Sequence, residues 1–146
     1  MELPDEIYEQ VEQLSEQGND LCEEGDFTGA IAVWQSALAL LPPPRQQWEA
    51  SVWLHASIGD AYYQEDEWQD AKAAFFDALN CPDAQVNPFV HYMLGKTLLR
   101  LDDEEGAVDH LLRAYMLDGV DIFDADEEEG PDALALLQNK GLVDEL

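Results

Sequence analysis

The chain has 146 residues, enough for one domain with a hydrophobic core of its own. Its 33 Asp and Glu against 6 Lys and Arg give a formal net charge of −27, while 47% of the residues are hydrophobic and four are tryptophan. This charge repels nucleic-acid phosphates and anionic membrane surfaces and attracts basic proteins. We therefore expect a folded protein with a basic partner, and we expect it to bind neither nucleic acid nor membrane.

The beginning of the chain, MELPDEIYEQ, has neither the basic region nor the apolar run of an export signal. No apolar stretch approaches the length that spans a bilayer. The two cysteines, Cys22 and Cys81, lack a C-x-x-C spacing and are expected to be reduced. These features predict a cytoplasmic protein.

Apolar residues recur at separations of three, four and seven, which indicates helices. Six helices are predicted near residues 4–24, 27–41, 46–64, 68–80, 88–101 and 104–117. The segments between them are EEGD, LPPPR, QEDE, NCPDAQVNP and LDDEE, all rich in capping or helix-breaking residues. A further helix is predicted in PDALALLQNKG, because Pro131 suits a first helical turn and Gly141 suits a helix end. It is expected to cover the end of the helical stack.

One pattern occurs three times along these helices. A glycine is followed by two alanines that flank a large apolar residue at fixed spacings. The copies contain Gly18, Ala30, Trp34 and Ala37; Gly59, Ala71, Phe75 and Ala78; and Gly95, Ala107, Leu111 and Ala114. Small residues let neighbouring helix backbones approach closely, and the large residue fills the remaining gap. The alanines therefore predict helix contacts and not a catalytic pocket.

This pattern resembles the tetratricopeptide repeat (TPR) family over about three quarters of the chain. The resemblance implies repeats at about 11–44, 52–85 and 88–121, followed by an acidic connector and a capping helix within 122–146. The glycines lie 41 and 36 residues apart, against 34 in the family. The expected fold is all-α: a right-handed α-solenoid of three TPR helix pairs with a C-terminal capping helix, as a single domain over 1–146.

In the TPR family the first helices of the repeats line a concave binding groove. The family's groove positions, carried over to this sequence, predict partner contacts at Asn19, Trp53, Asp60, Tyr63, Phe89, Tyr92, Lys96 and Arg100. The acidic connector adds Asp124, Asp126, Glu127, Glu128 and Glu129. Such a groove suits a peptide or helix with apolar anchors. The carboxylate clamp of chaperone-binding relatives matches only at Asn19, which argues against a heat-shock co-chaperone.

Catalytic and metal sites are less favoured. Acid pairs are abundant enough for glycoside hydrolysis, but a solvated acidic surface is the strongly preferred explanation. No nucleophile motif and no phosphate-binding glycine loop occurs. His55 and His91 hold equivalent repeat positions and could form a metal pair, although packing is the preferred interpretation. The segment from Asp124 fails as a calcium loop, because Glu129 and Ala135 stand at loop positions 6 and 12. We expect no metal and no cofactor.

Acids also cluster at the turn inside each repeat, in EEGD, QEDE and LDDEE. One acid per turn is explained by helix capping, since a carboxylate stabilises the N–H groups at a helix N-terminus. The remaining acids are consistent with an acidic ridge for a partner or simply with solubility, and the sequence leaves both interpretations open.

The expected function is that of a non-catalytic protein-interaction module for a basic protein or peptide. The preferred version is an immunity protein, an antidote that neutralises a bacterial toxin. The alternative is a TPR secretion chaperone that holds an extended client segment in its groove. A metal-dependent regulator or enzyme, using the acidic connector or the histidines, is the least favoured hypothesis.

Overall fold

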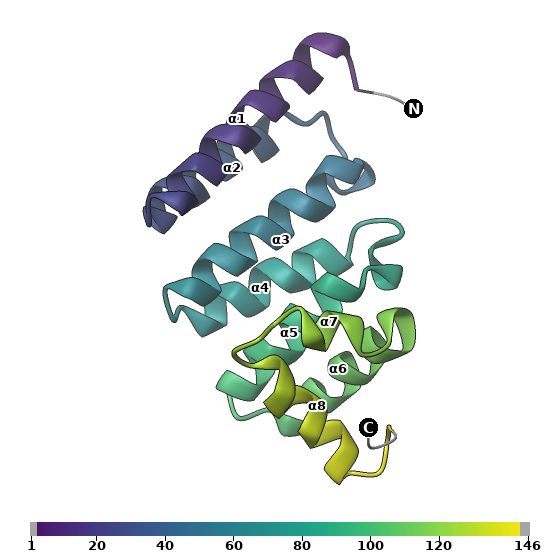
Figure 1. The fold of residues 1–146 in the computed structure, drawn as a ribbon. Coiled ribbons are helices and arrows are strands. Elements are labelled where there is room, and N and C mark those ends of the chain that lie inside the picture. The colour runs from purple at the N-terminus through teal and green to yellow at the C-terminus, as the bar shows by residue number, and fades with distance from the viewer. Residues whose placement is uncertain (1–2, 144–146) are drawn as a thin grey trace. The chain divides into compact units, whose positions relative to one another are not determined.

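The computed structural model describes residues 3–143, and within them the regular structure is entirely helical. The chain divides into two compact units, which are described separately: unit 1 is Met1–Ala84 and unit 2 is Gln85–Leu146. Unit 1 contains α1 Asp5–Glu23, α2 Phe27–Leu40, η1 Arg45–Gln47, α3 Glu49–Gln64, α4 Trp68–Leu79 and the first residue of η2 Ala84–Val86. Unit 2 contains α5 Pro88–Arg100, α6 Glu104–Asp118, α7 Asp121–Asp124 and α8 Gly130–Asn139 (Figure 1). The predicted all-α class and the consecutive helix pairs are confirmed, and the single domain over 1–146 stays a prediction.

In unit 1 each helix packs on the next one, from α1 through α4. One core cluster takes residues from all four helices, among them Val11, Trp34, Leu54 and Ala74. The segment between α2 and α3 belongs to this core as well, because its Trp48 is buried and the indole Nε1–H donates to a loop carbonyl 2.8 Å away. The first two repeats therefore share one hydrophobic core.

The repeat pattern produces the close helix packing that the sequence predicts. All six repeat alanines have no exposed surface. A Cβ added to Gly59 would lie 2.8 Å from the Phe75 ring, and one added to Gly95 would lie 2.7 Å from Leu111. At Gly18 it would overlap the indole of Trp34. The glycines and large residues thus pack directly on one another, so these alanines mark helix contacts.

The turn inside each repeat has the same backbone conformation. Gly25, Asp66 and Asp102 have φ angles of 83°, 61° and 62°, in the left-handed region. Aspartate tolerates this region better than most residues because its short polar side chain can bond locally. Two different residue types therefore produce one turn geometry.

Some of the turn acids cap helices. Asp26 accepts a hydrogen bond from the amide three residues along at 2.9 Å, and Asp103 does the same at 3.0 Å. Within unit 1 the turns of the first two repeats lie side by side, because the Thr28 hydroxyl donates to Glu65 at 3.0 Å. Capping therefore accounts for one acid in each of two turns.

In unit 2, α5 and α6 pair, and α8 packs against α6. The capping helix begins as predicted, with Pro131 in its first turn. The acidic connector holds an extra short helix, α7, which contacts α5, α6 and α8. Its Phe123 is 1% exposed and meets Tyr92 edge to face, with ring centroids 5.2 Å apart. This part of the connector is therefore an ordered component of the core of unit 2.

The two units differ in composition. All four tryptophans belong to unit 1: Trp34, Trp48, Trp53 and Trp68. Four of the six basic residues belong to unit 2, and each of them pairs with an acid of the same unit: Lys96, Arg100, Arg113 and Lys140. Of the helices described in residues 3–143, none combines the length and apolar character that crossing a bilayer requires.

Candidate functional site

A groove of about 790 Å³ runs between α1 and the beginning of α3 in unit 1. We call it the unit 1 groove. Its lining residues come from α1, from η1 and from the first turns of α3: Leu3, Asp5, Tyr8, Val11, Glu12, Ser15, Glu16, Asn19, Gln47, Trp48, Glu49, Ala50 and Trp53. Most of the α1 residues in this list are three or four positions apart and so share one helix face.

The unit 1 groove combines exposed aromatic rings with acidic side chains. Tyr8 and Trp53 are 52% and 40% exposed, and the buried residues Val11 and Trp48 line the same groove. Four of the lining residues are acids: Asp5, Glu12, Glu16 and Glu49. Among the lining residues in the described part of the chain there is no lysine, arginine or histidine.

The hydroxyl in this groove is already engaged. Ser15 is 5% exposed, and its Oγ donates to the Val11 carbonyl 2.7 Å away. Among the lining residues in the described part of the chain there is no histidine or cysteine to act as a base or nucleophile beside it.

The corresponding face of α5 in unit 2 carries Phe89, Tyr92 and Lys96. These residues, with Met93, line a smaller cavity of about 270 Å³ together with residues of the connector. The connector contributes Ile122, Ala125 and Asp126. We call this surface the α5 face. Here the chain's own connector contacts Tyr92 and Lys96, whose counterparts in unit 1 line an open groove.

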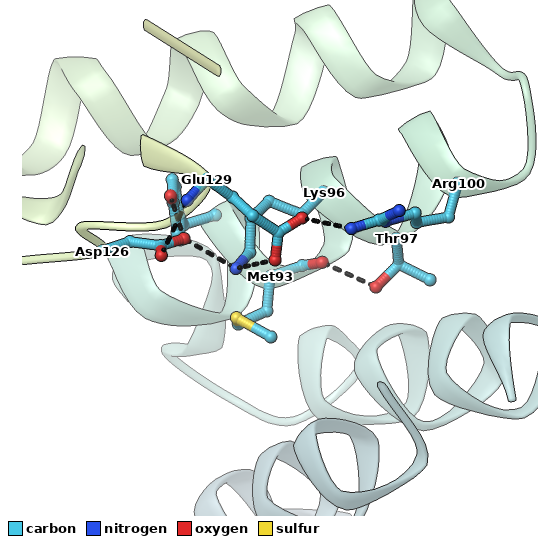
Figure 2. Close-up of polar contacts among 7 residues, drawn as sticks. Met93, Lys96, Thr97, Arg100, Asp126 and Glu129 are labelled. Atoms are coloured by element: carbon cyan, nitrogen blue, oxygen red, sulfur yellow. Dashed lines mark hydrogen bonds and ion pairs between the residues drawn. The ribbon is translucent and has the colours of Figure 1, made fainter. Parts of the chain in front are cut away.

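Polar contacts fasten the connector to the α5 face (Figure 2). Lys96 Nζ lies 2.7 Å from Asp126 Oδ2 and 3.3 Å from Glu129 Oε1. Arg100 Nη2 lies 2.8 Å from the other Glu129 oxygen, and the Tyr92 hydroxyl donates to Asp126 at 2.6 Å. Two acids of the connector, Asp126 and Glu129, thus pair with bases of α5.

The environment of Asp126 keeps it ionised. Burial by itself raises the pKa of this carboxyl, but hydrogen bonds from Lys96, from Tyr92 and from the amide of Glu129 outweigh it. The net result is a pKa below the usual value for aspartate. Asp126 therefore remains a carboxylate throughout the neutral range.

The structure brings the predicted partner residues together in two groups and leaves others apart. Asn19 and Trp53 line the unit 1 groove. The α5 face and its connector unite Phe89, Tyr92, Lys96, Arg100, Asp126 and Glu129. Three further predicted residues of the connector are exposed: Asp124, Glu127 and Glu128. The assignment of these residues to a partner stays a prediction.

Two predicted groove residues have local roles in unit 1. Tyr63 is 5% exposed and meets Trp68 edge to face, with ring centroids 4.9 Å apart. The charge of Asp60 acts on Cys22: burial raises the pKa of that thiol first, and the charge of Asp60 raises it further. Tyr63 therefore contributes mainly to packing.

Several residues of the unit 1 groove were not predicted from the sequence. Tyr8 and Glu49 were not expected in the site, although Tyr8 lies four residues before Glu12 and donates to it at 3.3 Å. Trp48 follows the three prolines, and its buried position in the loop indicates that this loop folds onto the core. An aromatic residue at this spacing from a groove position is the signal that would have identified Tyr8.

His91 is 1% exposed, and its ring pairs with that of His110. His91 Nδ1 lies 3.0 Å from His110 Nδ1, and His91 Nε2 lies 2.8 Å from the Gln85 carbonyl. A carbonyl only accepts, so Nε2 carries the proton of His91 and Nδ1 accepts from His110. Burial, followed by the neighbouring His91, lowers the pKa of His110. In residues 3–143 no cluster of three or more His, Cys, Asp or Glu side chains is placed to hold a metal ion.

Neither a protein-family model nor a curated protein sequence matches this chain. Its backbone is similar to solved structures, among them the crystal structure of MamA, a TPR-containing protein. The two share 20% sequence identity at a TM-score of 0.70, and the match covers 90% of this chain and 69% of MamA. This similarity establishes a TPR-like helical repeat fold.

Proposed function

We propose that this chain is a non-catalytic protein-interaction module that binds a basic segment of a partner protein in the unit 1 groove. The observation that carries the proposal is the lining of that groove. Two exposed aromatic rings stand among four carboxylates, with no basic residue among the described lining residues. The TPR-like fold is compatible with this role but does not by itself define a ligand.

A basic segment satisfies both features of the groove. Lysine and arginine donate charge-assisted hydrogen bonds to carboxylates, and these bonds are about twice as strong as neutral ones. The faces of Tyr8 and Trp53 offer cation–π contacts worth roughly 0.5–1 kcal/mol at exposed sites. The net charge of −27 also steers a basic partner toward the chain and speeds association.

An antidote for a basic toxin domain is the version that we propose first. A volume of about 790 Å³ lies in the range of ordinary ligand pockets. It therefore accommodates a few side chains, as a loop or short helix on a folded partner would present them. A secretion chaperone, the second candidate, would hold a longer extended segment and would need the groove to continue beyond these residues.

The groove can be tested with a defined probe, an amphipathic helical peptide that carries lysines on one face and leucines on the other. The triple variant E12Q/E16Q/E49Q removes three groove carboxylates, and we expect it to weaken binding at least about tenfold at low salt. The matched control, E9Q/D20N/E23Q, changes the net charge equally at exposed positions outside the groove. Equal weakening by both variants would reduce the interaction to nonspecific charge attraction.

The aromatic part of the site is tested by Trp53→Ala. An exposed aromatic anchor of this kind contributes about 2 kcal/mol or more to binding, so the affinity should fall roughly 30-fold. Titration calorimetry with the same peptide measures this change. An unchanged affinity would exclude Trp53 as an anchor and would move the site away from this groove.

The nature of the natural partner is tested by hydrogen exchange on the captured complex. A toxin domain held by an antidote should keep the amide protection of a folded protein. A chaperone client should remain largely unprotected outside the bound segment. A partner that is acidic in either case would contradict the proposal.

A further inference from the structure

The α5 face of unit 2 presents the same repeat positions as the unit 1 groove. Counted from the repeat glycine, Phe89, Tyr92 and Lys96 hold the helix positions of three α1 residues that line that groove. In unit 2 residues of the connector contact two of these positions, Tyr92 and Lys96. The connector therefore lies where a repeat of this kind would receive a ligand.

The contacts of the connector are those of a bound acidic peptide. Asp126 accepts from Lys96 and Tyr92, and Glu129 pairs with both Lys96 and Arg100. Phe123 supplies an apolar anchor, since it is 1% exposed and packs against Tyr92. One aromatic ring and two carboxylates three residues apart thus account for the recognition.

The α5 face is not completely filled by this internal segment. The cavity of about 270 Å³ lies beside Ala125, and on the α5 side it is lined partly by Met93 and by Phe89, which is 41% exposed. The side chain of alanine is a single methyl group, so a larger apolar side chain at that position would bury more of the cavity surface. A segment with a larger residue there would compete with the chain's own.

We propose that the α5 face is a receptor site for an acidic peptide segment with an apolar anchor, and that residues 121–129 occupy it as an exchangeable internal ligand. The site goes beyond the binding of a basic partner, because its ligand has the opposite charge and its residues belong to the other unit. A partner segment of the same chemistry binds when it displaces the internal one.

The probe is a labelled synthetic peptide with the sequence of residues 120–130. It is titrated by fluorescence polarisation into the full chain and into the D126N/E129Q variant, whose internal segment has lost the two carboxylates that pair with Lys96 and Arg100. An internal ligand competes at an effective concentration on the order of millimolar. We therefore expect the peptide to bind the variant at least about tenfold more tightly than the wild-type chain.

Two further peptides define the recognition. A peptide with leucine in place of Ala125 should bind several-fold more tightly, because it fills the cavity. A peptide with Asn and Gln in place of the two acids should lose binding. Adding Lys96→Gln to the variant should abolish binding of the acidic peptide. If the peptide binds the variant no better than the wild-type chain, or is indifferent to Lys96, the segment is only a structural cap and the proposal is wrong.

A second measurement keeps the proposal testable if the variant does not fold. Hydrogen exchange at residues 121–129 is followed in the wild-type chain with and without an excess of the leucine-containing peptide. Displacement predicts faster exchange in the internal segment, while the amides of α6 keep their protection. Unchanged exchange at saturating peptide would overturn the proposal.

Discussion

The first helices of the first and third repeats, α1 and α5, carry one repeat pattern but differ in burial. Three residues of α1 are buried, against nine of the shorter α5. Among the three equivalent groove positions the contrast is sharp at one, where Asn19 is exposed and Lys96 is 7% exposed. The repeat positions fix how helices pack, whereas residues outside the repeats decide whether the groove face is open. This comparison suggests four experiments.

The largest effect is expected from opening the α5 face. Phe123→Ala removes a buried ring from its contact with Tyr92 and should lower the free energy of unfolding of unit 2 by about 3–5 kcal/mol. Urea unfolding followed by circular dichroism measures the loss. The matched change in the open groove, Trp53→Ala, removes a 40% exposed ring and should cost less than about 1 kcal/mol. Similar losses would mean that the two faces are equally covered.

A smaller loss is expected from Lys96→Ala. The side chain of Lys96 is 8% exposed and that of Asp126 is 20% exposed, so the pair lies between a surface and a buried ion pair. Removing the base should destabilise unit 2 by about 1–3 kcal/mol. The control is Lys140→Ala, because its pair with Glu104 is exposed on both sides and should contribute less than about 0.5 kcal/mol. Equal effects would show that burial of Lys96 adds nothing.

A pH dependence should distinguish the two faces. The pKa of Asp126 is lowered in the folded chain, so its stabilising contribution is complete above the unfolded pKa of about 3.9 and is lost as the pH falls through the lower folded value. The wild-type chain should therefore lose its stability advantage over the D126N variant as the pH falls through this range. Hydrogen exchange in α7 and α8 at pH 5 and at pH 3 measures the difference. A constant difference between the two chains would contradict the role of this carboxylate.

The smallest effect has the opposite sign. Glu12 and Glu16 lie four residues apart on α1, where like charges destabilise a helix by roughly 0.2–0.5 kcal/mol. Glu16→Gln should therefore raise the free energy of unfolding of unit 1 by a few tenths of a kcal/mol, in contrast to the loss in D126N. Thermal unfolding at low and at high salt measures it, because added salt screens the repulsion and should remove the difference. A destabilised Glu16→Gln chain would show that this acid has a structural role.

The helices and their contacts could be predicted because their signals are local. Spacings of three and four residues place Ala71, Phe75 and Ala78 on one helix face. Pro42 ends a helix because its ring removes the backbone N–H donor. The observed helices begin and end within a few residues of the predicted ranges. Capping by Asp26 and Asp103 follows from the same local rules.

The closed α5 face could not be predicted in this way. Lys96 and Asp126 are 30 residues apart, and no local pattern specifies which of many acids a given base will pair with. Both residues were predicted to contact a partner, and Asp126 was assigned to an acidic connector. The available signal was Phe123 beside Ile122, because two large apolar residues in a run of acids indicate a segment that packs. The open unit 1 groove was found in part, through Asn19 and Trp53.

Because all four tryptophans belong to unit 1, tryptophan fluorescence comes from that unit alone. Indole emission reports the polarity and mobility around unit 1, with Trp53 at the groove and Trp34 in the core as contrasting environments. The chromophores of unit 2 are tyrosine and phenylalanine, so its opening is spectroscopically quiet at the tryptophan wavelengths. A ligand that alters indole emission can thus be assigned to the first two repeats without labelling the chain, and one that binds without altering it directs attention to unit 2.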